Sequence, residues 1–162
     1  MKKRIFVTAG TQLAFDRLLK WMNNWGSLND DSYILAQACD IKGRYDHLET
    51  VGLMSPQDYS QAITSSSLLV GHAGIGTIIT AHEQNLPLII VPREYSLGEH
   101  RNDHQIATAE KFKNIKGLYV ARNEQELHEL LNKKDLEYCS SEQSTNRQSF
   151  ISSLKNTIDA LL

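Results

Sequence analysis

The sequence predicts an α/β protein with a single Rossmann-like domain, built on a doubly wound, mainly parallel sheet with a C-terminal amphipathic helix. Short apolar runs alternate along the chain with segments of helical periodicity, which is typical of parallel strands covered by helices on both faces. The longest apolar run, residues 86–92, is far shorter than a membrane span. The length of 162 residues is sufficient for one domain with a full core.

Strands are predicted where apolar runs are bounded by turn residues, at residues 4–8, 33–38, 47–53, 67–71, 87–92 and 117–121. Helices are predicted between them. The first follows Thr11 as its N-cap and carries Phe15, Leu18, Leu19, Met22 and Trp25 at helical spacing. The second begins at Ser55-Pro56, because Ser caps helices and Pro fits the first turn. The later helices are predicted at residues 77–84, 102–112 and 124–131.

The chain divides into three predicted parts. Residues 1–131 form the Rossmann-like domain, and residues 132–146 form a polar, Ser-rich loop. Residues 147–162 carry an apolar stripe that predicts an amphipathic helix, which packs on the same domain or on a partner.

Charge and composition exclude several classes of function. The formal net charge of −2 supplies no basic field, so no nucleic-acid partner is expected. No apolar run is long enough for a membrane span, and the basic start of the chain precedes too short an apolar run for a signal peptide, so a cytoplasmic location is expected. Cys39 and Cys139 stand apart without metal-site spacing.

A glycine-rich segment, residues 70–77, follows the fourth predicted strand and opens a helix. Gly71, Gly74 and Gly76 let phosphate oxygens approach main-chain N–H groups, and the helix N-terminus adds free donors and partial positive charge. The spacing fits neither a P-loop nor a dinucleotide fingerprint. A phosphate-binding turn and a tight turn without ligand both remain open, as do a phosphate-contacting and a structural role for His72.

A second polar cluster, residues 93–105, follows the buried strand at residues 87–92. Loops beyond the carboxyl ends of parallel strands line the ligand crevice, so this cluster should share a rim with the glycine-rich segment. Arg93 and Arg101 are suited to phosphate or to acidic groups of a partner. His100 and His104 have the i, i+4 spacing of a metal pair but no third ligand, so no metal is expected. A solvated surface loop is the alternative.

These two stretches together resemble the C-terminal, donor-binding domain of glycosyltransferase family 28, which is half of a GT-B fold. The first has the form strand, His-Ala-Gly-x-Gly-Thr, helix, Leu-Pro and buried strand, seen here as His72 to Pro92, and the second carries the Asp-x-Gln signature at residues 103–105. The opening segment, residues 7–18, looks like the start of the small soluble subunits of two-part glycosyltransferases. Residues 98–105 are most similar to the bacterial exopolysaccharide group.

The resemblance implies a set of donor-binding residues. The diphosphate would meet Gly74, Gly76 and Thr77 beside His72, and the sugar would meet Gln105 with Asp103 or His104. Many relatives have a ribose-binding Glu at the position of Thr80, and Glu83 lies one turn further along the helix. The full expected set is Gly10, Thr11, His72, Gly74, Ile75, Gly76, Thr77, Thr80, Glu83, Arg93, His100, Asp103, His104 and Gln105.

The implied function is the UDP-sugar-binding half of a two-component inverting glycosyltransferase in exopolysaccharide or capsule synthesis. A GT-B enzyme needs two Rossmann-like domains, and 162 residues hold one. The expected partner is a membrane-associated subunit that brings the lipid-linked acceptor and the general base and holds this chain at the inner face of the membrane. No cofactor is expected, and the chain alone should have little or no activity. Two alternatives remain open: a scaffold or enhancer subunit that binds no donor, and a self-contained homo-oligomeric UDP-sugar enzyme such as an epimerase.

Overall fold

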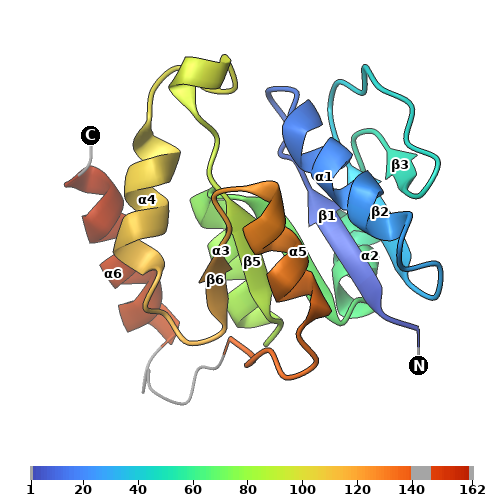
Figure 1. Ribbon diagram of the computed structural model, residues 1–162. Helices are drawn as coiled ribbons and strands as arrows, with labels where there is room; N and C mark the ends of the chain where they lie inside the picture. Colours follow the sequence, from blue (N-terminus) through green and yellow to red (C-terminus); the bar gives the residue numbers. More distant parts are fainter. Residues whose placement is uncertain (1, 140–146, 161–162) are drawn as a thin grey trace.

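A six-stranded parallel sheet forms the centre of the part of the chain described by the computed structural model, residues 2–139 and 147–160 (Figure 1). The strands are β1 (Arg4–Thr8), β2 (Tyr33–Gln37), β3 (Glu49–Val51), β4 (Leu68–His72), β5 (Leu88–Val91) and β6 (Leu118–Val120). Their order is β3-β2-β1-β4-β5-β6, with Val7 of β1 level with Ala36 of β2 and Val70 of β4. This order confirms the predicted doubly wound sheet, and the direction of winding reverses between β1 and β4.

Helices cover both faces of the sheet (Figure 1). One face is covered by α1 (Asp16–Gly26) and α5 (Glu124–Asn132). The other is covered by α2 (Pro56–Thr64), α3 (Ile75–Glu83), α4 (His104–Phe112) and α6 (Arg147–Asp159). Successive residues of β1 alternate between the two cores: Ile5 and Val7 face α1 and α5, and Phe6 faces the other layer.

Of the two N-cap residues predicted from the sequence, the structure confirms one. Ser55 caps α2 as predicted, since its Oγ accepts from Asp58 N at 3.1 Å. Thr11 does not cap α1, and that prediction was wrong. The helix begins at Asp16 with Phe15 in the N-cap position, because residues 9–14 form a loop whose carbonyls are bonded elsewhere.

Other boundaries moved by a few residues. The predicted helix at residues 77–84 begins at Ile75, with Gly74 as its N-cap, and the one at residues 102–112 begins at His104. The strand predicted at residues 47–53 is limited to Glu49–Val51. Each shift falls at an element end, where backbone hydrogen bonding outside the segment decides the boundary.

The last part of the chain packs on the same domain. Leu154 of α6 is buried in the core between the sheet and the helices α2, α3 and α4. Residues 133–139 follow α5, and Cys139 N donates to Leu86 O at 3.4 Å. Residues 140–146 of the predicted polar loop lie outside the described residues. Within the described residues, no helix has both the length and the apolar character needed to cross a membrane.

The turn before β6 depends on a glycine. Gly117 has φ +81, and a Cβ there would lie 2.2 Å from Cys139 N. We expect Gly117→Ala to lower the free energy of unfolding by at least twice the amount lost in Gly98→Ala. Gly98 has φ +69 and open space around it, so its replacement costs only the left-handed strain of about 1 kcal/mol. Denaturant unfolding of both variants measures the difference. Equal losses would show that residues 138 and 139 move aside freely.

Candidate functional site

A cavity of about 310 Å³ opens at the carboxyl edge of the sheet, beside the point where the winding reverses. Strand ends and the loops that follow them converge at such a switch point, so a ligand placed there meets several elements at once. The cavity is lined by Thr8, Gly10, Thr11, Gln37, Leu53, Met54, Tyr59, His72, Gly76, Thr77 and Thr80. None of these described lining residues is Asp, Glu, Lys or Arg.

The N-terminus of α3 forms one wall of this cavity. The main-chain N–H groups of its first turn have no intrahelical partners, and among the described residues no side chain caps this helix. Gly76 has no atom within 4 Å of an added Cβ, and Thr77 beside it is buried. Free N–H donors and the helix dipole at an open wall suit an anion.

His72 lies at the end of β4 and contributes a neutral imidazole to the cavity. Burial lowers the pKa of His72 to about 4, with the charges of Arg93 and His100 adding to the effect and a hydrogen bond to Thr8 O opposing it. The Nδ1 atom is 3.4 Å from Thr8 O, so Nδ1 carries the proton and Nε2 accepts. Nε2 faces Gly74, where an added Cβ would lie 2.3 Å away. Gly74 is therefore needed to accommodate the imidazole.

Five lining residues were missed by sequence reasoning: Thr8, Gln37, Leu53, Met54 and Tyr59. Thr8 and Gln37 end neighbouring strands, and Thr8 Oγ1 is 3.2 Å from Gln37 Oε1. The sequence did carry a signal that could have identified both as site residues, because each is a polar residue at the end of a buried strand. Tyr59 comes from α2, and its ring meets Phe6 edge-on at 5.4 Å between centroids. Burial raises the pKa of Tyr59. No local sequence pattern identifies Tyr59 as a site residue.

The structure brings six of the predicted site residues into the cavity wall: Gly10, Thr11, His72, Gly76, Thr77 and Thr80. Gly74 and Ile75 lie beside them at the start of α3. Thr80 Oγ1 donates a hydrogen bond to Gly76 O at 2.8 Å. Glu83 is exposed and does not line the cavity. Gln84, the next residue, lines a smaller neighbouring cavity of about 170 Å³ together with Tyr59, Ser60, Ile63 and Thr80.

The structure does not place Arg93 in the cavity wall, although the sequence suggested that it meets a phosphate or acidic groups of a partner. The residue is 3% exposed, and its guanidinium donates to main-chain carbonyls. A buried guanidinium satisfied in this way has lost the solvent-facing donors that phosphate binding needs.

Gln105 ties the two predicted loops together, but no residue of the second cluster lines the cavity, so the predicted shared rim is not seen there. Gln105 Oε1 accepts from Ala73 N at 3.2 Å and from Arg93 N at 3.0 Å. The buried amide oxygen of Gln105 is therefore engaged by the main chain. Gln105 does not line the cavity.

The remaining residues of the second cluster lie outside the cavity. Asp103 Oδ1 accepts from Tyr95 N at 2.9 Å, and His100 Nδ1 lies 3.1 Å from Asn102 Oδ1. His104 is exposed. Within the described residues, no three His, Cys, Asp or Glu side chains gather as a metal site.

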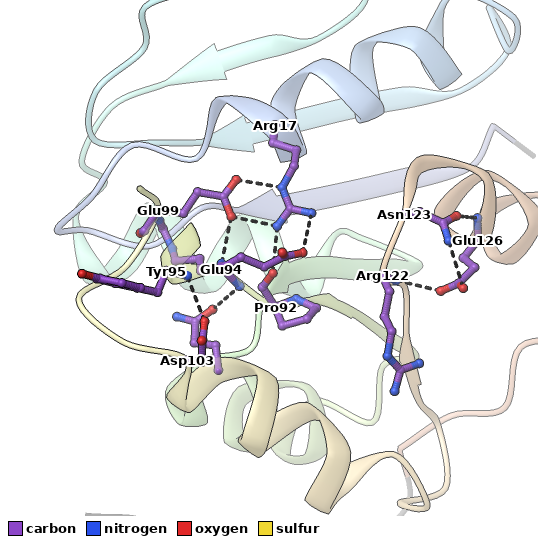
Figure 2. A network of polar contacts seen from close by, with 11 residues as sticks. Arg17, Pro92, Glu94, Tyr95, Glu99, Asp103, Arg122, Asn123 and Glu126 are labelled. Carbon is purple, nitrogen blue, oxygen red and sulfur yellow. Dashed lines mark hydrogen bonds and ion pairs between the residues drawn. The ribbon is translucent and has the colours of Figure 1, made fainter. Parts of the chain in front are cut away.

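Arg17 of α1 holds the loop at residues 92–103 in place (Figure 2). Its guanidinium makes a bidentate pair with Glu99, at 2.7 and 2.8 Å, and donates to Pro92 O at 2.9 Å. Glu94 lies 3.6 Å from Arg17. Paired, half-buried charges of this geometry are stronger than surface ion pairs. Figure 2 shows the ring of Tyr95, in the short 3₁₀ turn Tyr95–Leu97, pointing away from this network.

Comparisons with known proteins agree with this architecture. The model of the glycosyltransferase family 28 C-terminal domain matches residues 4–161. The UDP-N-acetylglucosamine transferase subunit ALG13 of Eremothecium gossypii is 33% identical over 95 residues, in a match that covers 52% of this chain and 45% of that protein. The match therefore spans less than half the length of this relative.

Solved structures show the same fold at low identity. The NMR structure of ALG13 has a TM-score of 0.63 at 18% identity and covers 94% of this chain and 95% of that chain. MurG of Acinetobacter baumannii has a TM-score of 0.63 at 15% identity, covering 96% of this chain and 50% of MurG. The glycosyltransferase of kitacinnamycin has a TM-score of 0.61 at 17% identity, and the match covers 99% of this chain and 40% of that glycosyltransferase.

The family match covers nearly all of the described residues, and the fold agrees with GT-B glycosyltransferases. The chain therefore belongs to the family of the glycosyltransferase family 28 C-terminal domain.

Proposed function

We propose that this chain is the donor-binding part of a two-part glycosyltransferase and that it holds a UDP-sugar in the cavity at the carboxyl edge. The observation that carries the proposal is the uncapped N-terminus of α3, which opens into a cavity whose described lining residues are uncharged. UDP-N-acetylglucosamine is the first donor to test, because the relative ALG13 is named as a subunit of a UDP-N-acetylglucosamine transferase.

The diphosphate would lie against the first turn of α3. The N–H groups there supply hydrogen bonds and partial positive charge, so neither a metal ion nor a lysine is needed to bind the anion. Gly76 leaves room for the phosphate oxygens. The hydroxyl and amide groups of Thr8, Gln37 and Thr80 offer partners for the sugar or ribose hydroxyls.

Transfer would be an inverting displacement at the anomeric carbon of the donor sugar. The acceptor hydroxyl attacks, the bond to the diphosphate breaks, and UDP leaves with its charge stabilised by the α3 N-terminus. The general base that takes the proton of the acceptor would come from the partner.

The partner is expected to cover the carboxyl edge of the sheet. MurG and the kitacinnamycin glycosyltransferase match this chain over 50% and 40% of their own lengths, so half or more of each has no counterpart in the match. Exposed apolar side chains stand on the same edge, including Leu53 at 72%, Tyr95 at 61% and Leu97 at 55%. Exposed apolar side chains around a cavity suit a protein partner. A membrane-associated subunit acting on a lipid-linked acceptor in exopolysaccharide synthesis would hold this chain at the inner face of the membrane.

The donor proposal predicts the effect of filling the space above Gly76. Gly76→Val should weaken binding of UDP-N-acetylglucosamine at least tenfold, because its side chain occupies the phosphate position. The fold should be unchanged, since an added Cβ at Gly76 meets no atom within 4 Å. Titration calorimetry with UDP-N-acetylglucosamine and with UDP-glucose measures the loss. Gln125→Val, at the equivalent position of α5, is the matched control and should bind as the wild type does.

The same titrations separate the competing functions. Wild-type chain without saturable binding of any UDP-sugar would favour a scaffold subunit and contradict the donor proposal. Chromatography of UDP-N-acetylglucosamine after incubation with the chain alone addresses the self-contained enzyme. Recovery of an epimer or a transfer product would contradict the need for a partner.

Donor binding should depend on pH through His72. In the free chain the pKa of His72 is about 4, and an adjacent diphosphate should raise it by favouring the imidazolium. The complex then binds more protons than the free chain, so affinity rises as pH falls from 7 toward 5. Calorimetry with UDP-N-acetylglucosamine measures the slope, because its diphosphate does not titrate in this range. His72→Gln should remove the slope, and an equal slope in both proteins would place His72 away from the diphosphate.

A further inference from the structure

The guanidinium of Arg93 makes an unusual set of contacts. Nη1 donates to Ala14 O at 2.7 Å and to Glu99 O at 3.1 Å. Nη2 donates to Leu13 O at 2.7 Å and also to Ala9 O. Both terminal nitrogens are thus used on main-chain carbonyls, and three of the four carbonyls belong to the loop at residues 9–14.

This side chain links elements that do not touch in the sheet. Arg93 follows β5, and the loop at residues 9–14 follows β1, with β4 between the two strands. The guanidinium therefore crosses the carboxyl end of β4 to reach its partners, with Cζ 4.5 Å from the centroid of the Phe15 ring. The main-chain N–H of Arg93 shares Gln105 Oε1 with Ala73 N, so the loop after β4 is tied to the same residue.

The loop held by Arg93 is a wall of the cavity. Gly10 and Thr11 line the cavity, and they lie between the bonded carbonyls of Ala9 and Leu13. Gly10 has φ +83, and a Cβ there would lie 3.2 Å from His72 Cε1, so the loop is close against the imidazole. The loop contains no helix or strand, and a change in its path would alter both the shape of the cavity and the burial of His72.

Lysine is a poor substitute for this arrangement. An ammonium group is a compact point charge with three donors, whereas a guanidinium is a planar fork that can bond carbonyls on two sides at once. Glu99, whose charge raises the pKa of Arg93 against the larger lowering by burial, already forms its bidentate pair with Arg17. The role of Arg93 thus lies in the directions of its donors as well as in its charge.

We propose that Arg93 is a positioning residue that fixes the loop at residues 9–14 against His72 and thereby sets the shape of the ligand cavity. Its effect on donor affinity rests on the proposed function, whereas its effect on the loop does not.

The test compares Arg93→Met and Arg93→Lys with the wild type. The first readout is the pKa of His72 in the free chain, followed by NMR of the imidazole protons. Both variants should raise this pKa by on the order of one unit, because a loosened loop admits water to His72. The second readout is the dissociation constant for UDP-N-acetylglucosamine, which should rise about tenfold or more in both variants.

Two controls separate positioning from charge and from general loss of stability. Arg93→Lys keeps the charge, so a wild-type pKa of His72 in this variant would overturn the proposal in favour of a purely electrostatic effect. Gly117→Ala destabilises the opposite edge of the sheet and should leave the pKa of His72 and the donor affinity unchanged. If Arg93→Met does not fold, the Lys variant alone decides between these outcomes.

A failure of the donor proposal is distinguishable from a failure of this one. Wild-type chain that does not bind UDP-N-acetylglucosamine contradicts the proposed donor site but leaves the His72 readout intact. Unchanged His72 signals in both Arg93 variants contradict the positioning role, whatever the affinity for UDP-N-acetylglucosamine.

Discussion

The reversal of winding between β1 and β4 is the constraint on which the rest of the structure depends. It sends the loops after these two strands to opposite faces of the sheet and leaves a crevice between them. The cavity lies at this crevice, and Thr8 at the end of β1 and His72 at the end of β4 contribute to its wall. The position of the site follows from the strand order, and the loops determine its chemistry.

An anion bound at this crevice, as we propose, would be held mainly by the backbone. The described lining residues bring no formal charge, and burial keeps His72 neutral at physiological pH. The partial positive charge available to a ligand is therefore that of the free N–H groups at the start of α3. The charge of Arg93 lowers the pKa of His72, although its side chain is bonded away from the cavity.

The sequence predicted the sheet and the glycine-rich segment because their signals are local. Apolar runs marked the buried strands, and Gly74 and Gly76 follow β4 at the start of α3. The contribution of Arg93 was not predictable in this way, because an arginine after a strand can face solvent or reach across the sheet. Its role depends on carbonyls of the loop at residues 9–14, about 80 positions earlier in the chain. The failure of Thr11 as a helix cap has the same origin, since that loop is shaped by a distant partner. Tyr59 is an amphipathic-helix residue whose place in the cavity follows from the packing of α2 against β1.

The central claim is that a UDP-sugar binds at the carboxyl edge of the sheet. Amide NMR spectra recorded during titration with UDP-N-acetylglucosamine test this most directly. We expect the largest shift changes at Gly10, Gly76 and Thr77. A second cavity, of about 480 Å³, lies at the opposite edge of the sheet and is lined in part by Trp25, Ser67 and Lys133. Shift changes confined to that edge, or no changes at saturating ligand, would contradict the account.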